Sequence, residues 1–290
     1  MIDFKTFADQ QIPAFESYLT EQLAQIEEPT LQKAMTYSVM AGGKRLRPLL
    51  VFAVLASAEL PIDQTAYRVA GALELIHSYS LIHDDLPAMD NDDLRRGQPT
   101  NHRVFGEAQA ILAGDGLLTL AFEWLTTTDL TAVQQSRAVQ LLAKAAGPSG
   151  MVAGQIEDIE GQTKTLSLAQ LKQVHHLKTG RLIECAIGLG ALLADLSAEQ
   201  SASLQIFAQN YGLAFQIQDD ILDVTSTAAA MGKAVHKDAG DHKNTFPGLL
   251  GLAGAKTALT ATCQAAQDAL ADLTGLDKAL LNSFLNYFNE

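Results

Sequence analysis

Apolar side chains recur at steps of three and four residues along most of the chain, which is the repeat of an α-helix with one face in the core. Leu73 and Ile76 follow this spacing, and Leu204, Phe207 and Tyr211 follow it again in the second half. No segment alternates Val, Ile and Thr between hairpin dipeptides, as β-strands do. The pattern therefore predicts an all-α fold.

Residues that interrupt helices fall between these periodic segments. They divide the chain into about ten helices joined by short loops, and no shift in composition is long enough to be a linker. We therefore expect a single domain over residues 1–290, built as a helical bundle. The interruptions are Pro29, Gly42-Gly43, Pro61, Pro87, Gly97 with Pro99, Gly147-Pro148, Gly161, the segment 195–197, Gly232 and Pro247.

The composition is that of an ordinary soluble globular protein, with 48% hydrophobic and 18% charged residues. The longest apolar stretch, from Gly116 to Leu125, is too short to span a bilayer. The N-terminal residues lack the basic-then-apolar layout of a secretion signal, so we expect a cytoplasmic protein without stable membrane insertion. Cys185 and Cys263 have no metal-binding spacing and are expected to be small core residues.

The formal net charge of −13 argues against binding to nucleic acid or to an anionic membrane surface. The basic residues are nevertheless clustered. In many acidic proteins such clusters are solubilising surface charge, but their position relative to the aspartates favours a functional role here. Ten of the twenty lysines and arginines fall in four segments: Lys44, Arg45, Arg47; Arg95, Arg96; Lys178, Arg181; and Lys233, Lys237, Lys243.

Two aspartate clusters lie at the ends of predicted helices. In the second cluster, Asp219, Asp220 and Asp223 lie within one helical turn of one another. Like charges at this spacing repel by roughly 0.2–0.5 kcal/mol per pair unless a cation neutralises them. Gln216 precedes the first two aspartates by three and four residues and places an amide on the same face.

The first cluster follows a periodic helix that ends near Asp84 and Asp85. Pro87 is expected to redirect the chain, so that Asp90 and its neighbours return from a turn. Oxygen ligands without histidine or cysteine favour Mg²⁺ or Ca²⁺ over zinc. A calcium loop of the EF-hand type is excluded, because its glycine and its final glutamate are both missing. For either cluster alone, a solvated acidic helix end is the alternative.

The surroundings of the clusters favour a site for diphosphates. Apolar residues precede both clusters, where an unpaired charge is costly, and bases follow both. Mg²⁺ is usually held by one or two carboxylates together with substrate phosphates, and no Gly-rich nucleotide-binding loop is present. The segment GGKRLRP, from Gly42 to Pro48, offers backbone N–H groups, a helix start and three cations for a second anion.

Together these motifs resemble those of the bacterial short-chain polyprenyl synthetases, over most of the chain from Ser38 to Asn244. Two ordered aspartate motifs, with GGKRLRP before them and KT between them, form a highly specific signature. The resemblance implies the isoprenoid synthase fold, with helices around a central cavity, and Mg²⁺-dependent trans-prenyl transfer by a homodimer. The matching segments are GGKRLRP at Gly42, HSYSLIHDDLPAMDNDDLRRGQPTNH at His77, FGEAQAILAGDGLLTLAFE at Phe105, GMVAGQIEDI at Gly150, LKTGRLI at Leu177 and FQIQDDILD at Phe215.

In this family the aspartates hold metal ions. By resemblance, two Mg²⁺ ions are held mainly by Asp84 and Asp90, and a third is held by Asp219. Mn²⁺ is expected to substitute for Mg²⁺. The implied metal set is Asp84, Asp85, Asp90, Asp219, Asp220 and Asp223, in which Asp85 has a supporting role and the last two act through water.

The bases and dipoles are implied to hold two substrates. The residues assigned to the allylic diphosphate are Arg95, Lys178, Lys233 and Lys243, and those assigned to isopentenyl diphosphate are Lys44, Arg47, His77 and Arg96. Thr179 and Gln216 correspond to dipoles that face the reacting carbons. The implied reaction is ionisation, condensation and elimination, with the departing pyrophosphate as proton acceptor. The implied catalytic set is Asp84, Asp85, Asp90, Lys178, Thr179, Gln216 and Asp219.

Product length is expected to depend on residues one turn before Asp84, because the hydrocarbon grows along that helix. The chain-length position of the family, five residues before the motif, is Tyr79 here, and Ser80 and Leu81 follow it. About 7 Å of helix separate Tyr79 from Asp84. Tyr79 and the two-residue insertion in DDLPAMD favour a C15 product. C20 and C10 products stay open, because Tyr79 also fits an ordinary core position.

Two segments depart from the family pattern. His236 stands where relatives usually have glycine, and histidine is strained there if the position requires a positive φ. Many relatives end in a basic tail that folds over the isopentenyl site. This chain ends Tyr287-Phe288-Asn289-Glu290, which argues against that contact.

Three other functions fit only parts of the sequence. A non-catalytic partner subunit is expected to lose motif residues, yet the six motif aspartates are all present. A generic scaffold for divalent cations explains the acids but leaves the bases unexplained. A terpene cyclase explains one aspartate motif but not the GGKRLRP segment.

Overall fold

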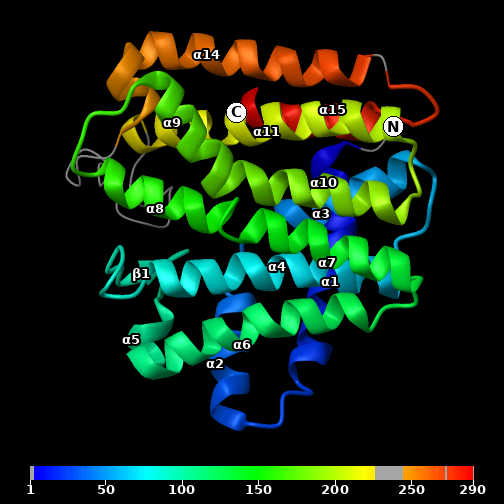
Figure 1. Cartoon of the computed structure of the whole chain (residues 1–290), viewed down its shortest axis with the longest axis vertical. Coiled ribbons are helices and arrows are strands. Elements are labelled where there is room, and N and C mark those ends of the chain that lie inside the picture. The colour runs from blue at the N-terminus through cyan, green and yellow to red at the C-terminus, as the bar shows by residue number, and fades with distance from the viewer. Residues whose placement is uncertain (1–2, 226–243, 272, 290) are drawn as a thin grey trace.

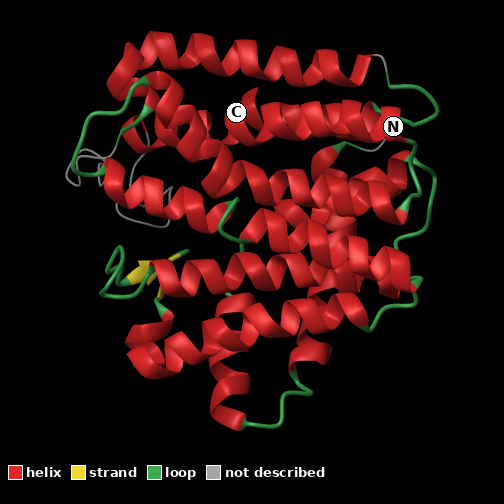
Figure 2. Cartoon of the chain, in the orientation of Figure 1, coloured by secondary structure: helices red, strands yellow, loops and turns green. Residues whose placement is uncertain are grey.

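The computed structural model describes residues 3–225, 244–271 and 273–289. Helices make up most of this part of the chain and pack into a bundle (Figures 1 and 2), so the predicted all-α fold is confirmed. The lysines at positions 233, 237 and 243 and His236 lie outside the described residues.

The elements follow one another along the chain in a simple order, with a π-helical turn η1 and a 3-10 helix η2 among the α-helices. α14 is broken at Gly251, where φ is 71° and ψ is 162°. The bounds are α1 Phe4–Leu23, α2 Pro29–Val39, α3 Leu46–Ser57, α4 Gln64–Asp84, β1 Leu94–Arg95, β2 Gln98–Pro99, α5 Asn101–Phe105, α6 Glu107–Thr126, α7 Ala132–Ala146, α8 Met151–Gly161, α9 Leu168–His175, η1 His176–Gly180, α10 Arg181–Leu193, α11 Ala198–Thr225, α14 Phe246–Ala271, α15 Ala279–Ser283 and η2 Phe284–Asn289.

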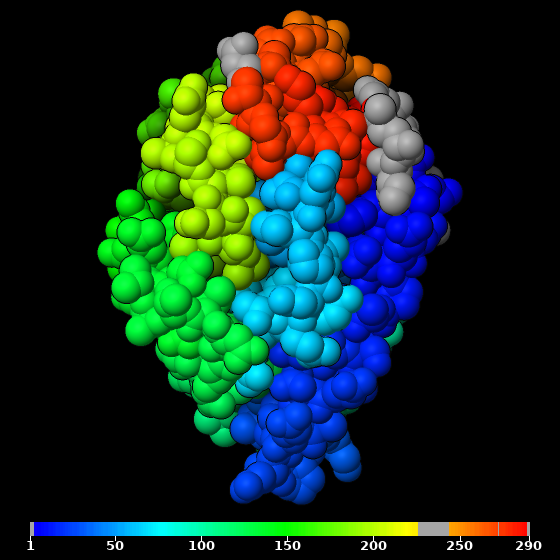
Figure 3. Space-filling model, turned by 90° about the vertical axis from the view of Figure 1, so that its right-hand side faces the viewer, coloured from blue at the N-terminus to red at the C-terminus, as the bar shows by residue number. Residues whose placement is uncertain are grey.

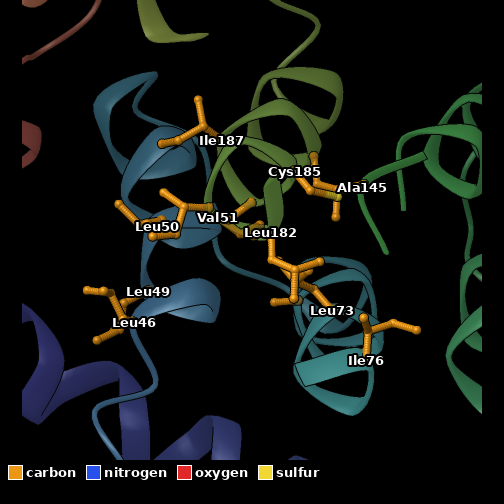
Figure 4. Close-up of a cluster of buried hydrophobic side chains, with 14 of the residues drawn as sticks. Leu46, Leu49, Leu50, Val51, Leu73, Ile76, Ala145, Leu182, Cys185 and Ile187 are labelled. Atoms are coloured by element: carbon orange, nitrogen blue, oxygen red, sulfur yellow. The ribbon is translucent and has the colours of Figure 1, made fainter. Parts of the chain in front are cut away.

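α4 lies at the centre of the bundle, between α6 on one side and α3 and α10 on the other (Figure 1). Its Leu73 and Ile76 are fully buried. Figure 4 shows them beside Leu50 and Val51 of α3 and Leu182 of α10. Over most of its length α4 presents apolar residues on every side, as a helix enclosed by other helices must.

Helix starts use capping residues that the sequence offers. Asp3 and Asp63 each accept a hydrogen bond from the backbone N–H three residues later, at 2.8 and 2.9 Å. Pro29 opens the first turn of α2. Thr131 and Ser167 form capping boxes with the glutamines three residues later. These contacts fix where the chain enters each helix. Pro29 and Asp63 lie at or near predicted interruptions, whereas no interruption was predicted near the start of α7 at Thr131.

A short hairpin was not indicated by the helical pattern. β1 and β2 pair in the antiparallel sense, with Arg95 opposite Gln98. Between them, Arg96 and Gly97 have φ of 55° and 78°, which is the conformation of a tight type I′ turn. Strands of two residues cannot display the alternation by which strands are identified in a sequence. The hairpin places Arg95 in β1 and Arg96 in the turn, so that these two neighbouring arginines have different surroundings.

Both aspartate motifs lie at the same end of the bundle. The last residues of α4, beside β1, and those of α11, beside α9, are both on the left in Figure 1. Figure 3 views the opposite end, where the connection from α3 to α4 is packed between the first helix, the α10–α11 turn and the C-terminal residues. The two motifs therefore face a common region.

Two minor expectations concern the core and the membrane. Cys185 is buried, Cys263 is partly buried, and both are free thiols. Burial raises the pKa of the Cys263 thiol to about 11, which fits an inert core residue. None of the described helices combines the length and apolar character needed to cross a bilayer.

The packing of α10 against α3 yields a prediction with an internal control. A Cβ at Gly190 would lie 2.7 Å from the Cβ of Val54 and 3.0 Å from the carbonyl oxygen of Val51. Gly190→Ala should therefore force α10 away from α3 and lower the free energy of unfolding by about 1–3 kcal/mol. A Cβ at Gly188 meets only ordinary contacts, 3.8 Å from Leu141.

Gly188→Ala should stabilise the protein by about 0.5–1 kcal/mol, because alanine favours a helix interior more than glycine does. Urea unfolding followed by circular dichroism measures both variants. Equal stability of the two variants would contradict the close α3–α10 approach.

Candidate active site

A cavity of about 570 Å³ opens between α3, α4, η1 and α11, at the end of the bundle where the motifs meet. It collects side chains from segments that are far apart in the sequence. Asp84, Asp90 and Lys178 lie beside this lining rather than in it. The predicted site residues that line the cavity are Lys44, Arg47, His77, Arg95, Arg96, Thr179, Gln216 and Asp219.

The first aspartate motif closes into a compact loop at the end of α4. The backbone N–H of Asp90 donates to the carbonyl of Asp84 at 2.9 Å, and that of Asp92 donates to the carbonyl of Asp85 at 3.2 Å. The chain thus returns on itself after Pro87, as the sequence predicted. Asp90 is adjacent to Asp84 because the loop is hydrogen-bonded and not because of helical periodicity.

Asp85 is buried, with 3% of its surface exposed, and holds Arg95. Arg95 Nε donates to Asp85 Oδ1 at 2.9 Å, and a second guanidinium nitrogen contacts the same oxygen. Burial raises the pKa of Asp85 to about 6, and Arg95 opposes that rise. Burial alone would lower the pKa of Arg95, but Asp85 raises it above its ordinary value. Because two donors meet one carboxylate oxygen, this geometry fits the ionised pair.

The three aspartates of the second motif have different surroundings. Asp219 lines the cavity, and Asp223 follows it by one turn on the same side of α11. Asp220 points elsewhere: its Oδ2 accepts a hydrogen bond from the backbone N–H of Phe246 at 2.8 Å and lies 3.4 Å from His175 Nε2. Asp220 therefore ties the start of α14 and the end of α9 to α11, a contact that the sequence did not indicate.

The π-helical turn η1 presents the KT pair. Such turns widen an α-helix by one residue and occur often at functional sites. The Thr179 hydroxyl donates to Gln216 Oε1 at 3.0 Å, so the two predicted dipoles are in contact at the cavity wall. Gly154 of α8 allows this turn to lie close, since a Cβ there would be 2.2 Å from the backbone nitrogen of Lys178.

Two residues of α8 complete the surroundings of the first motif and were missed in the sequence. Lys178 Nζ lies 2.7 Å from Asp158 Oδ2 and 3.9 Å from Asp84 Oδ2. Gln155 Nε2 donates a hydrogen bond to Asp84 Oδ1. The segment that contains both residues is part of the family resemblance, but no role was assigned to either. Their spacing of three on a predicted helix was the available signal.

The wall opposite the aspartates carries cations whose partners are neutral. Arg96 donates to the carbonyl of Gly42, and Lys44 Nζ donates to the hydroxyl of Tyr287. Arg47 Nε is buried and has no hydrogen-bond partner in the described part of the chain. Burial lowers the pKa of Arg47 to about 10, so it stays protonated at neutral pH. These charges are not cancelled by a hydrogen-bonded carboxylate, as that of Arg95 is.

His77 lies on the same wall. Burial lowers its pKa well below the ordinary value, and the positive charges of Arg47 and Arg96 lower it further. The imidazole is therefore neutral at neutral pH and offers one N–H donor. This wall thus combines cations with a neutral donor, which suits an anion.

Arg45 belongs to the same basic segment and borders the cavity together with Glu74, but carboxylates neutralise its charge. Its side chain is fully buried, with nitrogens 2.9 Å from Glu16 and 2.8 Å from Glu74, and it donates to the carbonyl of Val39 at 2.7 Å. Burial alone would lower the pKa of Arg45, but the two glutamates raise it. The sequence grouped Arg45 with the other bases of its segment, and its carboxylate partners distinguish it from them.

The carboxylates fit Mg²⁺ held jointly with a substrate. Among residues 3–225, 244–271 and 273–289, no three His, Cys, Asp or Glu side chains converge closely enough to hold a metal by themselves. Mg²⁺ needs only one or two carboxylates when phosphate and water supply its other ligands. Asp223 Oδ2 is buried without a hydrogen-bond partner in the described chain, and a nearby cation would satisfy it.

The predicted chain-length residues lie on the α6 side of α4. Tyr79 is 8% exposed, and its ring meets that of His83 edge-on at 5.7 Å. His83 Nε2 in turn lies 3.1 Å from the carbonyl of Ile111 in α6. Ser80 donates to a carbonyl of its own helix. Leu81, and not Tyr79, lines the described cavity, so the role of Tyr79 stays a prediction.

Other predicted residues lie outside the described part or act differently from the expectation. Lys233 and Lys243, assigned to the allylic diphosphate, are outside the described residues, as is His236. The sequence argued against a contact between the C-terminus and the isopentenyl site. A contact exists in another form, because the aromatic Tyr287 reaches Lys44.

The family model "Polyprenyl synthetase" matches residues 28–276 of the chain. The chain is similar to a farnesyl diphosphate synthase of Geobacillus stearothermophilus, with 50% identity over 94% of each chain. It is also similar to geranylgeranyl pyrophosphate synthase 11 of Arabidopsis thaliana, with 45% identity over 86% of this chain and 71% of the relative.

Solved structures agree with these sequence relatives. A geranyltransferase from Helicobacter pylori, complexed with magnesium and isoprenyl diphosphate, superimposes with a TM-score of 0.84 at 34% identity. The match covers 98% of this chain and 94% of that one.

The glycine pair before α3 yields a test of the cationic wall. Gly42 and Gly43 both have positive φ, of 82° and 117°, so alanine strains the backbone at either position. At Gly43 alone, a Cβ would also lie 2.6 Å from the guanidinium carbon of Arg96. Gly43→Ala should therefore displace Arg96 and weaken the binding of pyrophosphate about tenfold more than Gly42→Ala does.

Isothermal titration calorimetry, in the presence of a chelator that removes divalent metals, measures the affinity of each variant for pyrophosphate. Without metals only the cationic wall contributes. The same affinity in both variants would show that the position of Arg96 does not control anion binding.

Proposed function

The chain belongs to the polyprenyl synthetase family, and on this premise we propose that it is a trans-prenyltransferase that forms farnesyl diphosphate. Its substrates would be isopentenyl diphosphate and dimethylallyl or geranyl diphosphate, and its second product pyrophosphate. The high identity to relatives named farnesyl diphosphate synthase supports this assignment. Relatives named geranylgeranyl pyrophosphate synthase keep a C20 product as the alternative.

The observation that carries the proposal is the division of charge across one cavity. On one side, Arg95 and Lys178 are paired with carboxylates. On the other, Lys44 donates to a hydroxyl, Arg96 donates to a carbonyl, and Arg47 Nε has no hydrogen-bond partner among the described residues. A diphosphate accompanied by Mg²⁺ suits the first side, and a diphosphate without metal suits the second. Two diphosphates in different environments are what a prenyl condensation requires.

Mg²⁺, when bound with the allylic diphosphate, would stabilise the charge that develops on this leaving group. Asp84, Asp90 and Asp219 would hold it, and Gln155 would orient Asp84 through its hydrogen bond. Arg95 and Lys178 would add preorganised positive charge to the same group. Asp85 and Asp158 keep these two cations in place.

The reacting carbons would meet near Thr179 and Gln216. The Thr179 hydroxyl donates its proton to a hydrogen bond with Gln216 Oε1. The lone pairs of the Thr179 oxygen therefore stay available and would face a developing carbocation. Apolar Leu81, Ile183 and Phe215 line the cavity beside them and would exclude nucleophilic water. No strong base is needed, because pyrophosphate accepts the proton of the elimination.

Several finer features are part of the proposal. We expect three Mg²⁺ ions, with Mn²⁺ as a substitute, and a cytoplasmic homodimer. Exposed Val104, Ile111 and Leu112 on α5 and α6 support an interface between two copies. The contacts of Asp220 with Phe246 and His175 support an anchoring role for this aspartate beside the metal role predicted from the sequence.

Substitution of the motif aspartates tests the proposal. Asp84→Ala and Asp219→Ala should each lower turnover of isopentenyl and geranyl diphosphates, in the presence of Mg²⁺, by on the order of 10²–10³-fold, because each removes preorganised stabilisation of the leaving group. Radiolabelled product assays measure the rate. Asp268→Ala, an exposed aspartate on α14, is the matched control and should keep wild-type turnover. Near-normal turnover in either motif variant would exclude the mechanism.

Tyr79 provides the test of product length. Tyr79→Ala should lengthen the product beyond C15, because it opens space beside α6 along the helix that begins the hydrocarbon path. Tyr79→Phe keeps the ring against His83 and should keep the C15 product. Chromatography of the dephosphorylated products measures their length. A C15 product from Tyr79→Ala would show that Tyr79 does not limit product length. A C20 product from the wild type would instead establish the alternative function.

A further inference from the structure

Aromatic side chains hold the C-terminal helix η2 against α11 and α1. Phe284 is fully buried, with its ring 4.6 Å from that of Phe4 and 6.3 Å from that of Tyr211. Phe288 is also buried and lies 5.1 Å from Tyr211. These two phenylalanines precede and follow Tyr287 and fix the turn that carries it. The position of Tyr287 is therefore set by packing.

Tyr287 reaches the edge of the cavity. Its ring stacks on Phe215, with centroids 5.8 Å apart and planes 16° from parallel, and Phe215 lines the cavity. Lys44 Nζ donates a hydrogen bond to the Tyr287 hydroxyl and lies 4.3 Å from the ring centroid. That distance is within the range of a cation–π contact. One side chain thus joins the basic segment before α3 to the helix that carries the second aspartate motif.

The neutral character of this partner distinguishes Lys44 from Lys178. Lys178 is paired with Asp158, which compensates its charge. A phenol fixes an ammonium group without cancelling its charge, and it uses only one of the three N–H donors. Lys44 is otherwise exposed, and a free lysine side chain loses much rotamer freedom when it binds a ligand. Tyr287 restricts that freedom before any anion arrives.

We propose that Tyr287 is a positioning residue for isopentenyl diphosphate, which holds the Lys44 ammonium at the cavity wall ready for the diphosphate. This inference rests on the proposed function. Preorganisation of a binding group raises affinity by lowering the entropy lost on binding. The effect belongs to one substrate only, because Lys44 lies on the wall without carboxylate partners.

Two substitutions separate the hydroxyl from the ring. Tyr287→Phe keeps the stacking on Phe215 and should raise the KM for isopentenyl diphosphate about threefold to tenfold, the value of one hydrogen bond. Tyr287→Ala removes both contacts and should raise it further, to about 10- to 50-fold. The KM for geranyl diphosphate and kcat should change less than about twofold in Tyr287→Phe. A merely structural role would move all three constants together.

The control is Tyr67→Phe, which removes a hydroxyl from the aromatic cluster at the start of α4, far from the motifs. It should leave every constant unchanged. In a Lys44→Gln background, Tyr287→Phe should have no further effect on the KM for isopentenyl diphosphate, because the two residues act as a unit. An additive effect would show that Tyr287 does not act through Lys44.

Calorimetric titration with isopentenyl diphosphate, in the absence of divalent metals, provides a readout besides turnover. Weaker binding by Tyr287→Phe than by the wild type supports the inference. Equal or tighter binding would overturn it, since the hydroxyl would then be neutral or would compete with the ligand. A wild type that binds isopentenyl diphosphate but forms no prenyl product would instead refute the proposed function, which keeps the two failures distinct.

Discussion

The buried guanidinium of Arg45 joins four helices at the point where the cavity begins. It meets Glu16 of α1, Glu74 of α4 and the last carbonyl of α2, and it immediately precedes α3. A buried charge is tolerated only when partners of this kind surround it. Arg45 forms the direct ion pair with Glu74, whereas Nε of Arg47, two residues later, has no hydrogen-bond partner among the described residues. The cationic wall of the cavity therefore begins beside an ion pair whose charges are already compensated within the protein.

The same principle separates the two halves of the cavity. A site that must bind two diphosphates needs more positive charge than a folded core easily accepts. On the side of the aspartates, Asp85 and Asp158 compensate Arg95 and Lys178, so those cations stay ordered when no ligand is present. On the other side, carbonyl and hydroxyl groups orient Arg96 and Lys44 and leave their charge intact. The type of partner, more than the number of bases, distinguishes the two walls.

The sequence predicted what depends on local periodicity and on motif order. It predicted the helices, the turn after Pro87 and most residues of the cavity wall. It could not predict which neighbours of a motif turn away from the cavity, because burial depends on tertiary contacts. Asp220, which accepts a hydrogen bond from the backbone N–H of Phe246, is an example. Tyr287 was missed because a tyrosine carries no signal of such a contact until the fold brings it beside a charged group. Gln155 was missed although its spacing from Asp158 placed both side chains on one face of a predicted helix.

The π-helical turn at His176–Gly180 has a consequence for how this protein can vary. A π turn contains about one residue more than an α turn, and each residue of a helix rotates the next by about 100°. Loss of one residue there would restore a regular α-helix and swing Lys178 and Thr179 away from the cavity, with every side chain of the motif retained. The orientation of Lys178 and Thr179 therefore depends on the number of residues in this turn as well as on their identity. Insertions and deletions, to which loops are tolerant, are here as damaging as the loss of a catalytic group.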